Sequence, residues 1–121
     1  MTPIATLILL PRKVFEIKLS DGTIIKGQFG TWSLKRFCDK QNISLSEAQP
    51  KLQDLSGFAD YLLCSVEYLA RKEKAPFSFT DVDCCSWIDE LGGADSKLFV
   101  DLVVHTTDEN TTEEKKTDPQ A

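Results

Sequence analysis

The chain has 121 residues, of which 41% are apolar and 27% charged, as expected for one soluble globular domain. Its formal net charge of −5 argues against a nucleic-acid backbone as the main partner, since that role needs a clustered basic surface. The apolar run at residues 4–10 is too short to span a membrane and lacks the basic start of a signal peptide. We therefore expect neither a nucleic-acid nor a membrane partner.

The four cysteines, Cys38, Cys64, Cys84 and Cys85, indicate neither a metal site nor a catalytic one. No two are spaced as Cys-x-x-Cys, and His105 is the only histidine, so a zinc site would need ligands from scattered positions. That histidine is also the only base available to a cysteine nucleophile, and it lies beside the C-terminal tail. We expect free thiols packed as small apolar residues in a reducing cytosol. We also expect no cofactor, no metal and no catalytic residue, hence a protein that is not an enzyme.

An apolar arm, residues 1–13, precedes the first regular pattern of the chain. A β-prone arm of this kind pairs readily with an open sheet edge. Three interpretations remain open: an extra edge strand of the chain's own sheet, a flexible arm, or an arm that adds to a neighbouring sheet or subunit. We favour the third.

A β-hairpin follows the arm. Residues 14–19 alternate apolar and polar side chains, which is the period of a half-buried strand. The turn contains Asp21-Gly22, a pair that accepts the positive φ of tight hairpins, and the return strand covers residues 23–29. One hairpin is marginally stable in water, so it must lie on helices or pair with the arm or with another subunit.

The pattern changes from strand to helix within residues 29–38. Thr31 or Ser33 can cap a helix that runs to about residue 40. Trp32 lies about 100° or more around this helix from the centre of the apolar stripe, so it either packs on the hairpin or faces a partner. The inward stripe, spaced i, i+3, i+4, consists of Leu34, Phe37 and Cys38.

A capping box, Ser44 to Glu47, starts a second helix, which Pro50 must end, kink or offset. A short broken segment to about residue 55 follows, and Gly57 separates it from the next helix. Residues 58–74 form the longest and most apolar helix, expected to be a central core helix or an oligomer seam. Its narrow polar face consists of Asp60, Glu67, Arg71 and Lys74.

The C-terminal third begins with an extended link that carries Phe77 and Phe79. Thr80 can cap the helix after this link, and Gly92-Gly93 ends that helix. Ser96 can cap a last helix to about residue 105, although the β-branched residues there leave a strand open as an alternative.

The tail, residues 106–121, is polar and non-periodic, with five acidic and two basic residues, and is predicted to be disordered. The whole pattern predicts an α+β fold in one globular domain, residues 14–105. It consists of an N-terminal β-hairpin, or three strands if the arm joins it, and a bundle of four to five short helices.

Four segments carry a further signal. They are FEIKLSDGT at residues 15–23, FGTWSLKRFC at 29–38, LLCSVEY at 62–68, and FTDVD at 79–83 together with WID at 87–89. Together they resemble the tail assembly chaperones of long-tailed bacteriophages, in the form found in phages of gut Bacteroidetes. The likeness covers about residues 15–105, its motifs are structural rather than catalytic, and the arm lies outside it.

The resemblance implies a non-enzymatic chaperone that binds the tape measure protein, keeps this long helical client soluble and helps recruit tail tube subunits. It also implies a location in the cytoplasm of the infected bacterial host and absence from the mature virion, and it allows a homo-oligomer. The alternative function is a structural virion component, such as a tail-completion or head–tail connector protein. A third, a regulatory module that binds nucleic acid through the helix with Lys35-Arg36, is disfavoured by the acidic balance.

A client made of amphipathic helices needs an apolar groove that is exposed before binding. The alternative is that the large aromatic side chains proposed to line it all belong to the core. The candidate client-binding residues are Phe29, Trp32, Phe77, Phe79 and Trp87.

Overall fold

A three-stranded antiparallel sheet of order β1-β2-β3 opens the chain in the computed structural model, which describes residues 3–106. Its strands are β1 (Thr6–Leu10), β2 (Val14–Lys18) and β3 (Ile24–Gln28). β1 pairs with β2 along its whole length, so the arm supplies an edge strand of the chain's own sheet. The three-stranded form of the predicted α+β fold is thus confirmed, and the favoured pairing of the arm with a neighbouring sheet or subunit stays a prediction, since one side of β1 has no strand beside it among the described residues.

Alternation decides which side of the sheet is buried. Phe15, Ile17 and Ile25 are almost fully buried, whereas Glu16 and Lys18, next to them on β2, point the other way. The predicted Asp21-Gly22 turn joins β2 to β3, and Gly22 has a φ of 91°. A short 3-10 turn, η1 (Pro11–Lys13), joins β1 to β2.

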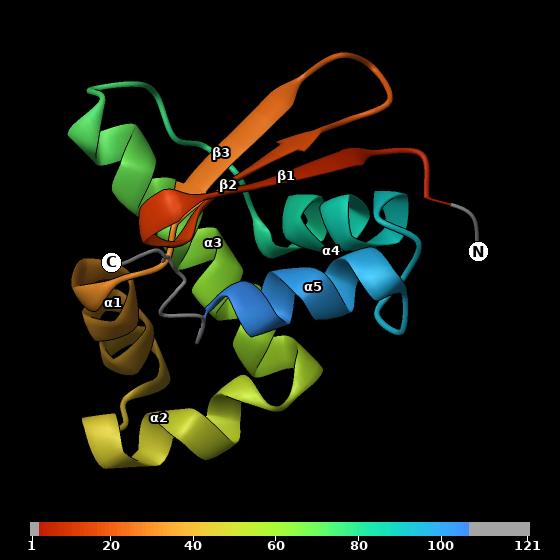
Figure 1. Cartoon of the computed structure of the whole chain (residues 1–121). Helices are drawn as coiled ribbons and strands as arrows, with labels where there is room; N and C mark the ends of the chain where they lie inside the picture. The colour runs from red at the N-terminus through yellow and green to blue at the C-terminus, as the bar shows by residue number, and fades with distance from the viewer. Residues whose placement is uncertain (1–2, 107–121) are drawn as a thin grey trace, which may run out of the picture.

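Five helices follow the sheet, of which the longest and the last make the main contacts with its strands (Figure 1). The longest, α3, packs against β3 and against α1, α2 and α4, so it is a central core helix, one of the two roles that its apolar composition predicted. The helices are α1 (Thr31–Gln41), α2 (Leu45–Leu52), α3 (Leu55–Lys72), α4 (Asp81–Glu90) and α5 (Lys97–His105).

Three predicted caps are confirmed. Ser44 forms its capping box with Glu47, and Thr80 forms an equivalent box with Asp83. The Ser96 side chain accepts a hydrogen bond of 3.1 Å from the backbone N–H of Phe99, and the last element is a helix rather than a strand. The tail predicted to be disordered lies, apart from Thr106, outside the described residues.

Two local predictions are wrong. The cap of α1 is Gly30, not Thr31 or Ser33, because the Ser33 hydroxyl instead donates a hydrogen bond of 2.7 Å to the carbonyl of Gln28. Gly57 does not separate two helices but lies in the first turn of α3. A Cβ at that position would overlap the carbonyl oxygen of Lys51, so glycine is what lets α2 and α3 meet so closely.

A row of aromatic rings joins the layers of the core. The Phe29 ring lies 4.9 Å from the ring of Phe15 and 5.1 Å from that of Tyr61, centroid to centroid. The Phe58 ring meets that of Phe99 edge-on at 5.3 Å. These five residues come from β2, the β3–α1 junction, α3 and α5. The row of rings therefore connects the sheet to α3 and α5.

Candidate functional site

A groove of about 750 Å³ lies between α1, α2, α5 and the start of α3. We call it the α2–α5 groove; the elements that surround it are seen in Figure 1. Its floor consists of the core side chains Phe58, Tyr61 and Phe99, which are nearly buried. Half-buried aliphatic side chains of α1 and α5, Leu34 and Val103, continue the apolar lining outward.

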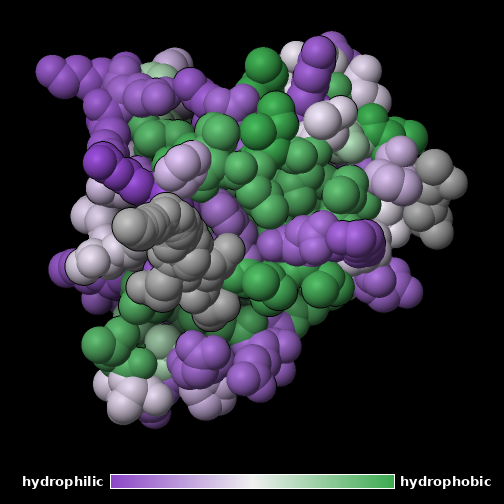
Figure 2. Space-filling view, viewed as in Figure 1, coloured by the Kyte–Doolittle hydropathy of each residue, from purple (hydrophilic) through white to green (hydrophobic). Residues whose placement is uncertain are grey.

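Exposed aliphatic side chains extend the lining to the surface. Leu45 of α2 is 69% exposed, Leu55 of α3 53% and Val104 of α5 55%, and all three line the groove. Single exposed leucines on a surface need no explanation, but here three large aliphatic residues line one hollow. Figure 2, coloured by hydropathy, shows further apolar surface on the side of β1 and α5, above and below a hydrophilic strip.

Few charges line the groove. Among the residues that line it, only Lys13 and Asp54 are charged, and Gln49, Gln53 and Thr31 supply further polar groups. Burial raises the pKa of Tyr61 in the floor to about 12, so its phenol is neutral at physiological pH. The lining therefore favours apolar contact with a partner over proton transfer or ion binding.

The groove was not predicted from the sequence, because Pro50 was expected to end, kink or offset the second helix and a broken segment to follow it. α2 in fact continues through Pro50 to Leu52. A recognisable signal was present: an apolar stripe at spacing i, i+3, i+7, i+10, which crosses Pro50 and runs into α3. The residues of this stripe are Leu45, Ala48, Leu52 and Leu55.

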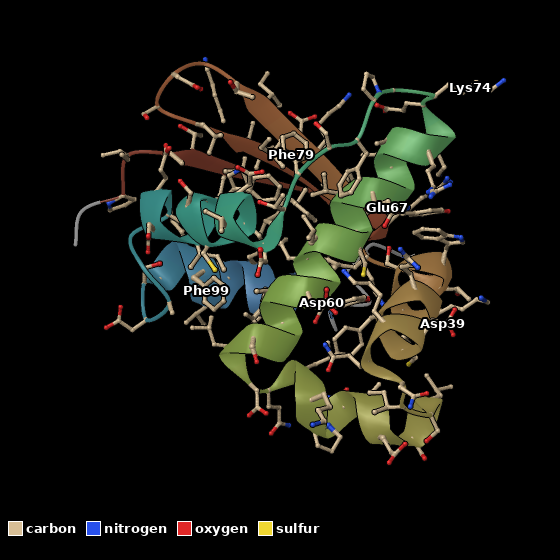
Figure 3. The ribbon with its side chains drawn as sticks, turned by 180° about the vertical axis from the view of Figure 1, so that it is seen from behind. Asp39, Asp60, Glu67, Lys74, Phe79 and Phe99 are labelled. Carbon is tan, nitrogen blue, oxygen red and sulfur yellow. The ribbon has the colours of Figure 1, made fainter. Side chains whose placement is uncertain are left out.

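The five predicted client-binding residues do not line the groove and do not form one surface. Phe29 and Trp87, only 1% and 3% exposed, are core residues, which corrects their assignment to an exposed lining. Phe77 and Phe79 are half-buried, and the Phe79 ring packs edge-on against Trp87 at 5.1 Å, so the link before α4 closes over the core (Figure 3). Trp32 of α1 is half-buried.

Trp32 packs on α3, neither on the hairpin nor freely in solvent. Its indole stacks on the Tyr68 ring with centroids 5.6 Å apart and an interplanar angle of 18°. The Arg71 guanidinium lies 5.7 Å from the centre of the indole ring, and Lys72 lies over Tyr68. A small hollow of about 250 Å³ beside Trp32 is bounded by cationic side chains and one acid, Asp39.

Two carboxylates of α3 hold α1 through ion pairs (Figure 3). Glu67 accepts hydrogen bonds from Arg71, at 3.0 and 3.1 Å, and from Arg36 at 3.4 Å. Asp60 lies 2.7 Å from the Lys40 ammonium. Burial by itself would lower the pKa of Lys40, but the hydrogen bond and charge of Asp60 outweigh it and raise that pKa. These acids therefore hold α1 to α3.

The thiols lie as the sequence predicted, with one exception. Cys38, Cys64 and Cys84 are buried, whereas Cys85 is exposed. Burial raises the pKa of Cys64 and of Cys84 to about 12, so both are protonated thiols at neutral pH. Within residues 3–106, no three side chains of His, Cys, Asp or Glu are grouped to hold a metal ion.

Two further findings complete the picture of the site. In the described part of the chain, no helix has both the length and the apolar character to cross a bilayer. Comparison of the chain with protein families, with curated protein sequences and with solved structures returned no match.

Proposed function

We propose that the chain is a non-enzymatic binding protein that holds one face of an amphipathic helix in the α2–α5 groove. Following the resemblance, we further propose a tail assembly chaperone of a long-tailed bacteriophage, with the tape measure protein as the source of that helix. The observation that carries the proposal is the exposure of Leu45, Leu55 and Val104 around a single apolar groove. Exposed apolar surface in a groove is where helices of partner proteins dock.

The size of the groove supports a helix face as its occupant. Its volume of about 750 Å³ lies within the range of well-formed binding sites, yet is too small for a whole helix with a diameter of about 10–12 Å. Apolar side chains spaced i, i+3, i+4 along one face of the client would fill it. With few charges in the lining, contact with one segment is expected to be weak and tolerant of sequence.

A long client turns weak contacts into firm retention. Several chaperone molecules bound along one tape measure protein would cover its apolar stripe over its full length, and linked binding events gain avidity without any new contact. In this proposal the chaperone acts in the cytoplasm of the infected host, helps recruit tail tube subunits and leaves before the virion is complete.

The first prediction concerns the exposed rim of the groove. Leu45→Asp places a charge where the client helix docks, and the affinity for a helical segment of the tape measure protein should fall about tenfold or more. Leu45 is the first residue of α2, where an acidic side chain suits the helix dipole, so the variant should fold normally. Binding is measured by titration calorimetry, and folding by circular dichroism.

The matched control is Val82→Asp. Val82 is 73% exposed on α4 and is not among the groove residues, so this variant should bind like the wild type. Equal loss of binding in both variants, or in neither, would contradict the groove as the client site. The wider proposal fails if the chain does not increase the soluble yield of co-expressed tape measure protein, or if mature virions contain it in stoichiometric amounts.

A further inference from the structure

The outer edge of β1 is an open strand edge. β1 pairs with β2 along one side, and no strand of the described residues pairs with its other side. Natural sheets block such edges with charged side chains, prolines or bulges, since an open edge is a template for further pairing. β1 carries no charge or proline in its five residues, and Ile8 and Leu9 are 42% and 39% exposed.

The opposite edge of the sheet is different. β3 carries a charged side chain, Lys26, whose ammonium lies 3.3 Å from a carboxylate oxygen of Glu73. β1 therefore differs from β3 in lacking the feature that discourages edge pairing.

The two ends of β1 carry charges of opposite sign. At its C-terminal end the chain enters η1 through Arg12, which is exposed, and Lys13. At the N-terminal end, the backbone N–H groups of Ile4 and Ala5 both donate hydrogen bonds of 2.9 Å to the carbonyl of Glu90. α4 ends there with Asp89 and Glu90, and Lys18 of β2 lies opposite Thr6, so acidic groups outnumber basic ones among the described residues at this end of the strand.

We propose that two copies of this chain pair through β1, antiparallel about a two-fold axis, to form a continuous sheet of six strands. An antiparallel arrangement brings the basic end of each β1 to the acidic end of its partner. A parallel arrangement would place like charges together, so the charge pattern selects the antiparallel one. A second copy of the chain presents an acidic end to the basic end of the first β1 and a basic end to its acidic end. A two-fold interface of this kind is self-complementary.

The dimer keeps the pattern of each sheet intact. In the combined sheet Leu7 and Leu9 continue the buried side, as their registers opposite Ile17 and Phe15 require. Ile8, the middle residue of β1, lies at the two-fold axis opposite its own copy. No residue of β1 lines the α2–α5 groove, so the dimer does not depend on the proposed client site.

Sedimentation velocity of the full chain over a wide range of concentrations tests the pairing. The wild type should show a reversible monomer–dimer equilibrium. Ile8→Lys places two like charges on the axis and should weaken dimerisation about tenfold or more. Ile24→Lys is the matched control, because Ile24 is 52% exposed on β3 and the substitution adds the same charge away from the pairing edge.

Charge reversal tests the orientation. Arg12→Glu and Asp89→Lys should each weaken the dimer, and the double variant should restore it. Both residues are exposed, so these variants carry the test even if Ile8→Lys does not fold. A wild type that stays monomeric, an Ile8→Lys dimer as tight as the wild type, an equal effect of Ile24→Lys, or a double variant no tighter than the single ones would overturn the proposal.

Discussion

At the scale of single residues, Glu67 lies on the predicted polar face of α3 but is buried between two helices, where its ion pairs hold them together. A Glu67–Arg71 pair at i, i+4 on an exposed helix face would be worth a few tenths of a kcal/mol. Instead the Glu67 side chain is only 11% exposed, because α1 packs beside it and brings Arg36 as a second donor. A carboxylate in this position depends on its partners to offset the loss of water.

We therefore expect Glu67→Gln to lower the free energy of unfolding by about 1–2 kcal/mol, measured by urea denaturation at neutral pH. The loss arises because two arginines lose their counter-charge while the remaining amide is still largely buried. Glu73→Gln is the control: the Lys26–Glu73 pair is 44–45% exposed on each side, so its removal should change stability by less than about 0.5 kcal/mol. Equal effects of the two substitutions would show that burial of Glu67 is unimportant.

At the scale of elements, close approach between the sheet and α3 depends on a glycine in β3. A Cβ at Gly27 would meet the Phe15 ring and lie 3.1 Å from the backbone nitrogen of Val66 in α3. The Phe15 ring is fully buried and in contact with Phe29, so it has little room to move. This approach is what allows the longest helix to lie directly on β3.

Gly27→Ala should accordingly destabilise the fold by about 1–3 kcal/mol through overpacking, seen as a lower denaturation midpoint with an unchanged m-value. Gly30→Ala provides the comparison. A Cβ at Gly30 meets nothing within 4 Å, and its φ of 171° is extended backbone that any residue adopts. If Gly27→Ala were as stable as Gly30→Ala, α3 and β3 would have to lie further apart than described.

At the scale of the whole molecule, the cysteines report on the integrity of the core. Cys38, Cys64 and Cys84 are buried in different elements, α1, α3 and α4, whereas Cys85 is exposed beside one of them. The Cys84 thiol also donates a hydrogen bond of 3.3 Å to the carbonyl of Ala59, so it is held between α3 and α4. Access to the three buried thiols requires these helices to separate.

Thiol labelling should therefore be biphasic. In the native protein at neutral pH, Cys85 should react rapidly, and the other three only at the rate of global opening, because they are shielded and the pKa of Cys64 and Cys84 is raised to about 12. Mass spectrometry counts the labels over time, and Cys85→Ser should abolish the fast phase alone. Rapid labelling of Cys64 in the native state would contradict the central position of α3.

The sequence by itself determined the features that depend on neighbours in the chain. Alternation in residues 14–19, the Asp21-Gly22 turn and the caps at Ser44, Thr80 and Ser96 all act over a few residues. They suffice for the α+β class and for the order of its elements. The apolar composition of the long helix likewise predicted either a central core helix or an oligomer seam, since its polar side chains share one narrow face.

Only the tertiary structure decided which apolar faces stay uncovered. Helical periodicity gives the direction of a side chain but not what stands in front of it, so Phe29 and Trp87 were placed on a surface and lie in the core. Trp32 stacks on Tyr68, which lies 36 residues further along the chain. The α2–α5 groove is formed by four helices, and no local sequence pattern shows that they lie together. Exposure is a property of packing between distant segments, and candidate binding surfaces here follow from that packing.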